Sequence, residues 1–226
     1  MKYRWIHSWS VAAGILFVLL TIVSMLTYPG GRIGHPQSAG YSFWLNFFSD
    51  LGRARTFTGG PKLISYSSFA FALVCAGITG ILYFATFPEF FRNTRQFRLV
   101  QMGSLAGVVS SYCFVGIALA PWDLYLLIHL GCVYVAFSSL LLAVLCFIPS
   151  ILKSAVLPPR YAFVYAGFAL ILGAYLCILF FGPRATDTGL MIQATAQKVV
   201  VYANVICMLI QSYGMLCLPE HLPNAH

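Results

Sequence analysis

The sequence predicts an all-α protein that crosses a membrane six times. Hydrophobic residues make up 60% of the 226 residues and charged residues only 8%, whereas about a quarter of the residues in a soluble domain are charged. Six long apolar runs follow one another along the chain, and no Asp, Glu, Lys or Arg lies near the middle of any run. The length suits one compact helical bundle, so a single integral membrane domain is expected over residues 1–226.

Each apolar run provides roughly the 20 residues that a helix needs to cross the hydrocarbon core of a bilayer. Lys2 and Arg4 precede the first run, as in a signal peptide, but no small-residue cleavage site follows it. We therefore expect this run to remain as a membrane anchor. The six expected spans are residues 11–28, 63–87, 99–120, 124–151, 161–182 and 199–218.

Basic residues in the short connections predict the orientation, because cytoplasmic loops are enriched in Lys and Arg. With both termini in the cytoplasm, the short outer loops receive only Arg184 and Lys198. The long first outer loop, residues 29–62, holds further basic residues, but long loops contribute less to orientation. The inner side receives the larger set: Lys2, Arg4, Arg92, Arg95, Arg98, Lys153 and Arg160.

The first outer loop has the least ordinary composition in the chain. Residues 29–40 are rich in Gly and Pro and predict an irregular stretch. Apolar residues then recur at helical spacing: Tyr41, Trp44, Phe48 and Leu51. Polar residues share another face of the same segment: Asn46, Asp50 and Arg53. This pattern predicts a short helix at the outer membrane interface, with its polar face turned towards the mouth of the bundle.

The string Asn46 to Gly52, NFFSDLG, resembles the N-x-x-S-D-L-G signature of the domain-of-unknown-function family 998. Members of that family are small six-helix membrane proteins of bacteria and archaea with no established biochemical role. A fainter resemblance is to the eukaryotic FRAG/DRAM/Sfk group, whose first outer loop carries a comparable S-D-x-G. Both groups have a histidine in the fourth helix, where this chain has His129. The resemblance implies the six-helix fold and a bacterial or archaeal plasma membrane, and it implies no activity.

Few polar residues remain that could form a functional site. Asp123 comes at the start of the fourth span, where it could instead stabilise the positive end of the helix dipole. His129 lies deeper in that span and could either hydrogen-bond a neighbouring helix or transfer protons. Amide side chains follow one face of the sixth span and form an amide stripe that could cross-link helices or line a cavity: Gln193, Gln197, Asn204 and Gln211. The candidate ligand-binding residues of an outer pocket are Asp50, Arg53, Arg55, Asp123, His129, Gln193 and Gln197.

Several classes of function are disfavoured by the sequence. The five histidines are dispersed, without an HxxxH or HExxH motif, so neither a metal site nor a cofactor such as haem is expected. The absence of a carboxylate near the middle of a span disfavours ion-coupled transport. The basic residues are scattered at helix ends, which disfavours binding to nucleic acid.

Three functions remain, and membrane lipids are the expected partners in each, with protein partners left open. The first, non-catalytic function is binding of a lipid or another amphiphile at the outer face, or stabilisation of a membrane assembly, with Arg53 and Arg55 available for phosphate. The second is an outer-leaflet lipid-modifying enzyme that uses Asp50, Asp123 or His129 as acid or base. The third is a facilitative carrier or scramblase along the amide stripe. The sequence leans towards the non-catalytic function.

Overall fold

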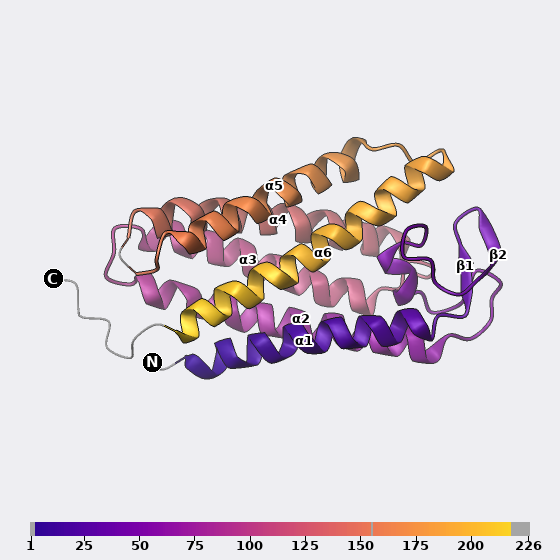
Figure 1. The fold of residues 1–226 in the computed structure, drawn as a ribbon, viewed down its shortest axis with the longest axis horizontal. Coiled ribbons are helices and arrows are strands. Elements are labelled where there is room, and N and C mark those ends of the chain that lie inside the picture. The colour runs from indigo at the N-terminus through magenta and orange to yellow at the C-terminus, as the bar shows by residue number, and fades with distance from the viewer. Residues whose placement is uncertain (1–2, 155, 218–226) are drawn as a thin grey trace.

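A computed structural model describes residues 3–154 and 156–217 of the chain (Figure 1). Six helices are long and apolar enough to cross a membrane, which confirms the predicted all-α fold and the number of helices. Lys2 and Leu218, on which the expected orientation and the end of the last span partly depend, lie outside the described residues. The six helices are α1 (Arg4–Leu26), α2 (Leu63–Thr86), α3 (Phe97–Leu119), α4 (Leu126–Leu152), α5 (Arg160–Phe181) and α6 (Asp187–Leu216).

The helices pack in a closed ring in chain order. Each helix contacts the next one along the chain, and α6 closes the ring against α1. Small residues allow close approach between neighbours: Gly80 of α2 lies against Ser111 of α3, and Gly107 of α3 lies against Phe84 of α2. A methyl group at either glycine would collide with these side chains. The ring therefore depends on small residues at the helix contacts.

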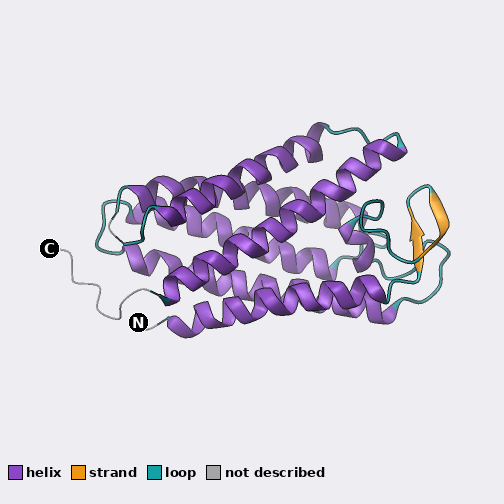
Figure 2. Ribbon diagram, viewed as in Figure 1, coloured by secondary structure: helices purple, strands orange, loops and turns teal. Residues whose placement is uncertain are grey.

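The described ends of the chain lie at the same end of the bundle, which we call the terminal end (Figure 1). The opposite end, the hairpin end, carries the antiparallel strands β1 (Gly30–Arg32) and β2 (His35–Ala39), and also the 3-10 helix η1 (Phe48–Gly52) (Figure 2). A second 3-10 helix, η2 (Phe87–Phe91), continues α2 at the terminal end.

The prediction of an irregular stretch over residues 29–40 is wrong, because this stretch forms the β-hairpin. Four glycines in it have positive φ angles, between 60° and 135°, which other residues rarely adopt: Gly30, Gly31, Gly34 and Gly40. They allow the chain to reverse within a few residues. The glycines that suggested an irregular stretch are thus the residues that make the hairpin.

The helix predicted from the Tyr41–Leu51 stripe shortens to η1. Phe47, just before η1, has an extended backbone with ψ of 151°, so the helical spacing of the apolar residues does not continue through it. α6 begins at Asp187 and not at residue 199. Its first turn is capped by Thr186, whose hydroxyl accepts a hydrogen bond from the Gly189 N–H at 3.1 Å. The polar start of α6 lowers its hydropathy there, which is why the prediction began the span too late.

Candidate functional site

A cavity of about 360 Å³ opens at the hairpin end between α4, α5, α6 and the first loop. Apolar side chains form most of its wall, and we call it the hairpin-end cavity. Four of the seven candidate residues line it together: Asp50, His129, Gln193 and Gln197. The other three candidates, Arg53, Arg55 and Asp123, are not among its lining residues. The sequence analysis missed further polar lining residues: Ser49, Trp122 and Arg184.

Asp50 is fully buried and organises the first loop from within. Its Oδ2 accepts hydrogen bonds from the Phe47 N–H at 2.9 Å and from the Asn46 side-chain amide at 3.1 Å. The same amide donates to the Gly31 carbonyl at 2.8 Å, which ties η1 to the hairpin. Asp50 Oδ1 has no hydrogen-bond partner among the described residues. Burial raises the pKa of Asp50 from 3.8 to about 6, although these hydrogen bonds and nearby cations oppose the shift.

Two buried lysines hold η1 against the bundle, and the sequence analysis assigned neither of them a role. Lys62 donates to the carbonyls of Asp50 at 2.5 Å and Leu51 at 3.0 Å. Lys198 donates to the carbonyls of Asn46 at 2.5 Å and of its own helix. Burial lowers the pKa of Lys62 from 10.5 to about 7, with Asp50 acting in the opposite direction. A lysine beside the amide stripe of the sixth span was the sequence signal that could have indicated this role for Lys198.

Arg53 lies over two aromatic rings that meet at an angle. Its guanidinium carbon lies 3.9 Å from the centre of the Phe57 ring and 4.3 Å from that of the Trp122 ring. Its Nε donates to the Arg55 carbonyl at 3.0 Å. Arg53 therefore fixes the Trp122 ring, while the Arg55 side chain is exposed. The two arginines do not meet in the cavity.

Asp123 fastens the first loop to the segment before α4. Its two carboxylate oxygens accept from the backbone N–H groups of Ala54 at 2.9 Å and Arg55 at 3.0 Å. α4 begins at Leu126, and its first turn contains no acidic residue. Asp123 thus lies outside the first turn of this helix, and both of its oxygens bind the loop backbone.

Three lining side chains are fixed through bonds to the backbone. Nδ1 of His129 lies 2.8 Å from the Ala120 carbonyl at the end of α3. A carbonyl can only accept, so Nδ1 carries a proton, and Nε2 of the neutral ring is left as an acceptor. Gln197 accepts from the Phe48 N–H at 2.8 Å through its oxygen, and Gln193 donates to the Ile178 carbonyl at 2.8 Å through its nitrogen.

An apolar groove of about 560 Å³ lies beside the hairpin-end cavity, between α5 and α6. It faces outwards, since Ile171, Ile192 and Val199 in its wall are each at least 40% exposed. Tyr175 lines both the groove and the cavity. The Gln193–Ile178 hydrogen bond joins a lining residue of the cavity to one of the groove. Polar and apolar compartments are therefore adjacent at the hairpin end.

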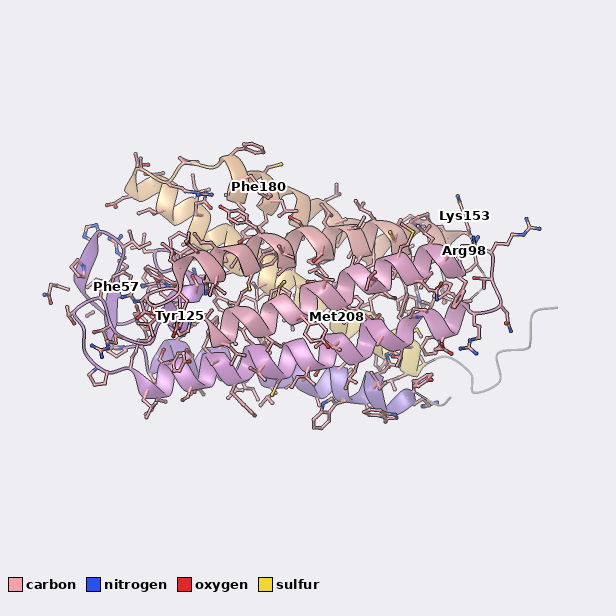
Figure 3. The ribbon with its side chains drawn as sticks, turned by 180° about the vertical axis from the view of Figure 1, so that it is seen from behind. Phe57, Arg98, Tyr125, Lys153, Phe180 and Met208 are labelled. Carbon is pink, nitrogen blue, oxygen red and sulfur yellow. The ribbon has the colours of Figure 1, made fainter. Side chains whose placement is uncertain are left out.

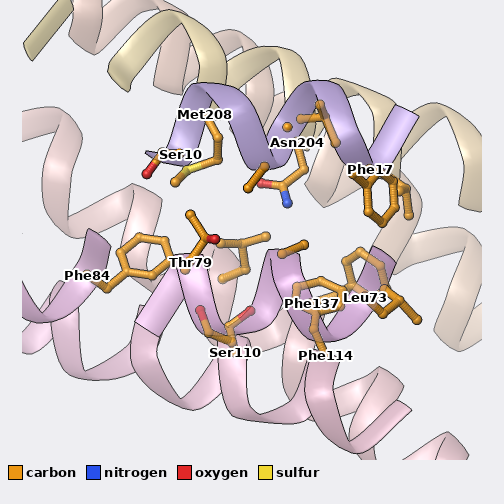
Figure 4. A pocket seen from close by; sticks show the side chains of 18 residues that line it. Ser10, Phe17, Leu73, Thr79, Phe84, Ser110, Phe114, Phe137, Asn204 and Met208 are labelled. Carbon is orange, nitrogen blue, oxygen red and sulfur yellow. The ribbon is translucent and has the colours of Figure 1, made fainter. Parts of the chain in front are cut away.

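A smaller cavity of about 100 Å³ lies inside the ring of helices (Figure 4). Phe17 in its wall lies 6.2 Å, between ring centres, from Phe48 of η1. Phe48 also contacts the rings of Phe69 and Tyr202. Phe137, in the wall of this central cavity, packs against Tyr175 with ring centres 4.8 Å apart. Aromatic contacts thus lie between the central cavity, η1 and the hairpin-end cavity.

No family model, curated protein or solved structure matches this chain. The resemblance to family 998 therefore stays a prediction. No group of three His, Cys, Asp or Glu side chains that could hold a metal ion occurs in the part of the chain that the structure describes. What the site offers chemically is a carboxylate, an imidazole, amides, an indole, hydroxyls and the exposed guanidinium of Arg184 around one cavity.

Proposed function

We propose that this chain is an integral membrane protein that binds a lipid or another amphiphile at its hairpin end. The observation that carries the proposal is that Asp50, His129, Gln193 and Gln197 line one cavity that shares Tyr175 with an apolar groove on the surface. A cavity of about 360 Å³ has the size of a small-molecule pocket. The polar part of an amphiphile fits the cavity, and an acyl chain fits the groove.

The distribution of exposed charge supports an orientation with the hairpin end outside the cell. Figure 3 shows Arg98 and Lys153 at the terminal end, where five basic residues are exposed: Arg92, Arg95, Arg98, Lys153 and Arg160. At the hairpin end Arg53, Lys62 and Lys198 are buried, and only Arg55 and Arg184 are exposed among the described Lys and Arg residues there. Cytoplasmic loops are the ones enriched in basic residues.

Labelling of single cysteines, in a variant without the native cysteines, tests this orientation. In intact cells, a cysteine that replaces Thr58 should react with an impermeant maleimide, and a cysteine that replaces Asn93 should not. The reverse pattern would refute this orientation.

A lipid-modifying enzyme is the second candidate, because His129 and Asp50 line the same cavity. The unprotonated Nε2 of a neutral His129 suits a general base. Asp123 does not support this role, since both of its oxygens are bound to the loop backbone. The carrier function has less support: Gln193 and Gln211 of the amide stripe both donate to backbone carbonyls of α5.

The binding proposal is tested by filling the cavity. Val133 lines it and is buried, whereas Val135 of the same helix is 46% exposed on the outer surface. We expect native mass spectrometry of the protein, extracted in mild detergent, to show one bound lipid in the wild type. Val133→Phe should lose most of this lipid, and the matched control Val135→Phe should keep it. Equal lipid retention in the two variants, or none in the wild type, would contradict the proposal.

A further inference from the structure

We infer that the polar group taken up by the hairpin-end cavity is neutral and carries hydroxyls, as in a glycerol or sugar headgroup. This inference rests on the proposed function and names its ligand class. It comes from the unused hydrogen-bonding atoms of the residues that line the cavity. These atoms include donors as well as acceptors.

The unused acceptors belong to three side chains. Asp50 Oδ1 is buried and has no partner among the described residues. His129 Nε2 and Gln193 Oε1 are the acceptors that remain after their partner atoms bind the Ala120 and Ile178 carbonyls. Neither has a hydrogen bond within the described residues. A ligand must therefore donate to satisfy this part of the cavity.

Two of the unused donors belong to Trp122 and Gln197, which also line the cavity. The indole N–H of Trp122 is buried without a hydrogen-bond partner in the described chain. The side-chain amide nitrogen of Gln197 remains free to donate, since the oxygen of that amide binds the Phe48 N–H. A ligand that only donates would leave these two groups unsatisfied.

Three classes of headgroup can be compared by their charge: an anionic phosphate, a cationic ammonium and a neutral hydroxyl. A fully ionised phosphate can only accept, so it would leave Asp50 Oδ1 without a donor and would face the Asp50 carboxylate. Arg184 is a cation in the cavity wall, but it is exposed and its guanidinium already binds the Leu179 carbonyl and the Tyr134 hydroxyl. An ammonium can only donate, and Lys62 and Lys198 already oppose the charge of Asp50. A hydroxyl both donates and accepts and carries no charge. Hydroxyl groups are thus the ones that match both sets of atoms.

The site is also held in place before a ligand arrives. Asp50, His129, Gln193 and Gln197 each use a second polar atom to bind the backbone. Trp122 is fixed by the guanidinium of Arg53. Groups that are already ordered lose little conformational entropy on binding, which favours affinity for a ligand of matching pattern.

The test compares ligands that share an oleoyl chain. The purified protein in detergent is titrated with mono-olein, with methyl oleate, which has no hydroxyl, and with oleoyl lysophosphatidic acid, and bound ligand is counted by native mass spectrometry. We expect mono-olein to bind at least about tenfold more tightly than either of the others. Trp122→Phe and Asp50→Asn should each remove most of this preference. Trp9→Phe, on the exposed surface of α1 near the terminal end and in the wall of neither the cavity nor the groove, should leave the preference unchanged.

The outcomes separate this inference from the proposed function. Mono-olein and methyl oleate could bind equally, with Val133→Phe abolishing both. This result would overturn the hydroxyl class but keep the amphiphile site, and water would then satisfy Asp50 and Trp122. Tightest binding of the lysophosphatidic acid would also overturn the hydroxyl class. Failure of all three ligands to bind would refute both proposals.

Discussion

The two ends of the bundle use their charges in opposite ways. At the hairpin end Lys62, Lys198 and Asp50 are buried, and each is bound to the chain. At the terminal end Arg98 and the other basic residues of its loops are exposed. The basic residues therefore include a buried group that builds the fold at the hairpin end and an exposed group at the terminal end, while Arg55 and Arg184 are exposed at the hairpin end.

The ends also differ in their buried polar groups. His7 at the terminal end is fully buried, and neither ring nitrogen has a hydrogen-bond partner among the described residues. It packs against the rings of Tyr83 and Phe90, each with centres 5.6 Å apart. At the hairpin end, by contrast, Asp50 combines two bonds with one free oxygen that lies beside a cavity. A buried polar group without a partner suggests a ligand site only where there is room for a ligand.

The largest expected effect comes from removing a buried cation. Lys198→Met should destabilise the protein by about 2 to 3 kcal/mol, because the Asn46 carbonyl loses its charged donor. The exposed Arg98 provides the matched control, and Arg98→Met should change the stability by less than about 0.5 kcal/mol. Unfolding in detergent, followed by circular dichroism, measures both. Similar stabilities of the two variants would remove the distinction between the ends.

The next effect separates the shape of Asp50 from its charge. Asp50→Leu removes the acceptor of the Phe47 N–H and the Asn46 amide, and should cost about 2 kcal/mol. Asp50→Asn keeps an oxygen at that position and should change the stability by less than about 1 kcal/mol. The same unfolding measurement applies. If Asp50→Asn lowers the stability as much as Asp50→Leu does, then the charge of Asp50 holds the loop, and not the position of its acceptor oxygen.

A further comparison uses pH, which changes protonation without removing a side chain. The pKa of Asp50 is raised to about 6 from 3.8, so the folded state holds this proton more tightly than the unfolded state. The contribution of protonated Asp50 to the free energy of unfolding is therefore fully present below about pH 4 and is lost as the pH rises through 6. We expect the melting temperature to fall across this window in the wild type, and less so in Asp50→Asn. Identical pH profiles would show that Asp50 does not titrate there.

Lys62 should act in the opposite direction at higher pH. Its pKa is lowered from 10.5 to about 7, so the unfolded state binds this proton more tightly. Stability should therefore rise as the pH increases from about 7 towards 10.5. Lys62→Met should lack this rise, whereas Arg98→Met should retain it.

Part of the candidate site was predictable from sequence, because two segments separated by an even number of spans must lie at the same end of the bundle. Asp50 follows the first helix, His129 begins the fourth, and Gln193 and Gln197 begin the sixth. All four must then lie at the same end of the bundle. Arg53, Arg55 and Asp123 share that end as well, yet stacking and backbone bonds hold them out of the cavity wall.

The sequence by itself determined the six helices, because the length and hydropathy of each run are local properties. A run of roughly 20 apolar residues is what a helix needs to cross a bilayer. Only the tertiary structure decided which charges are buried, since that depends on where η1 meets α2 and α6. Lys62 and Lys198 are as polar in the sequence as Arg98, but carbonyls of the first loop surround their ammonium groups. Burial of a charge depends on partners far away in the chain, and a local pattern does not contain them.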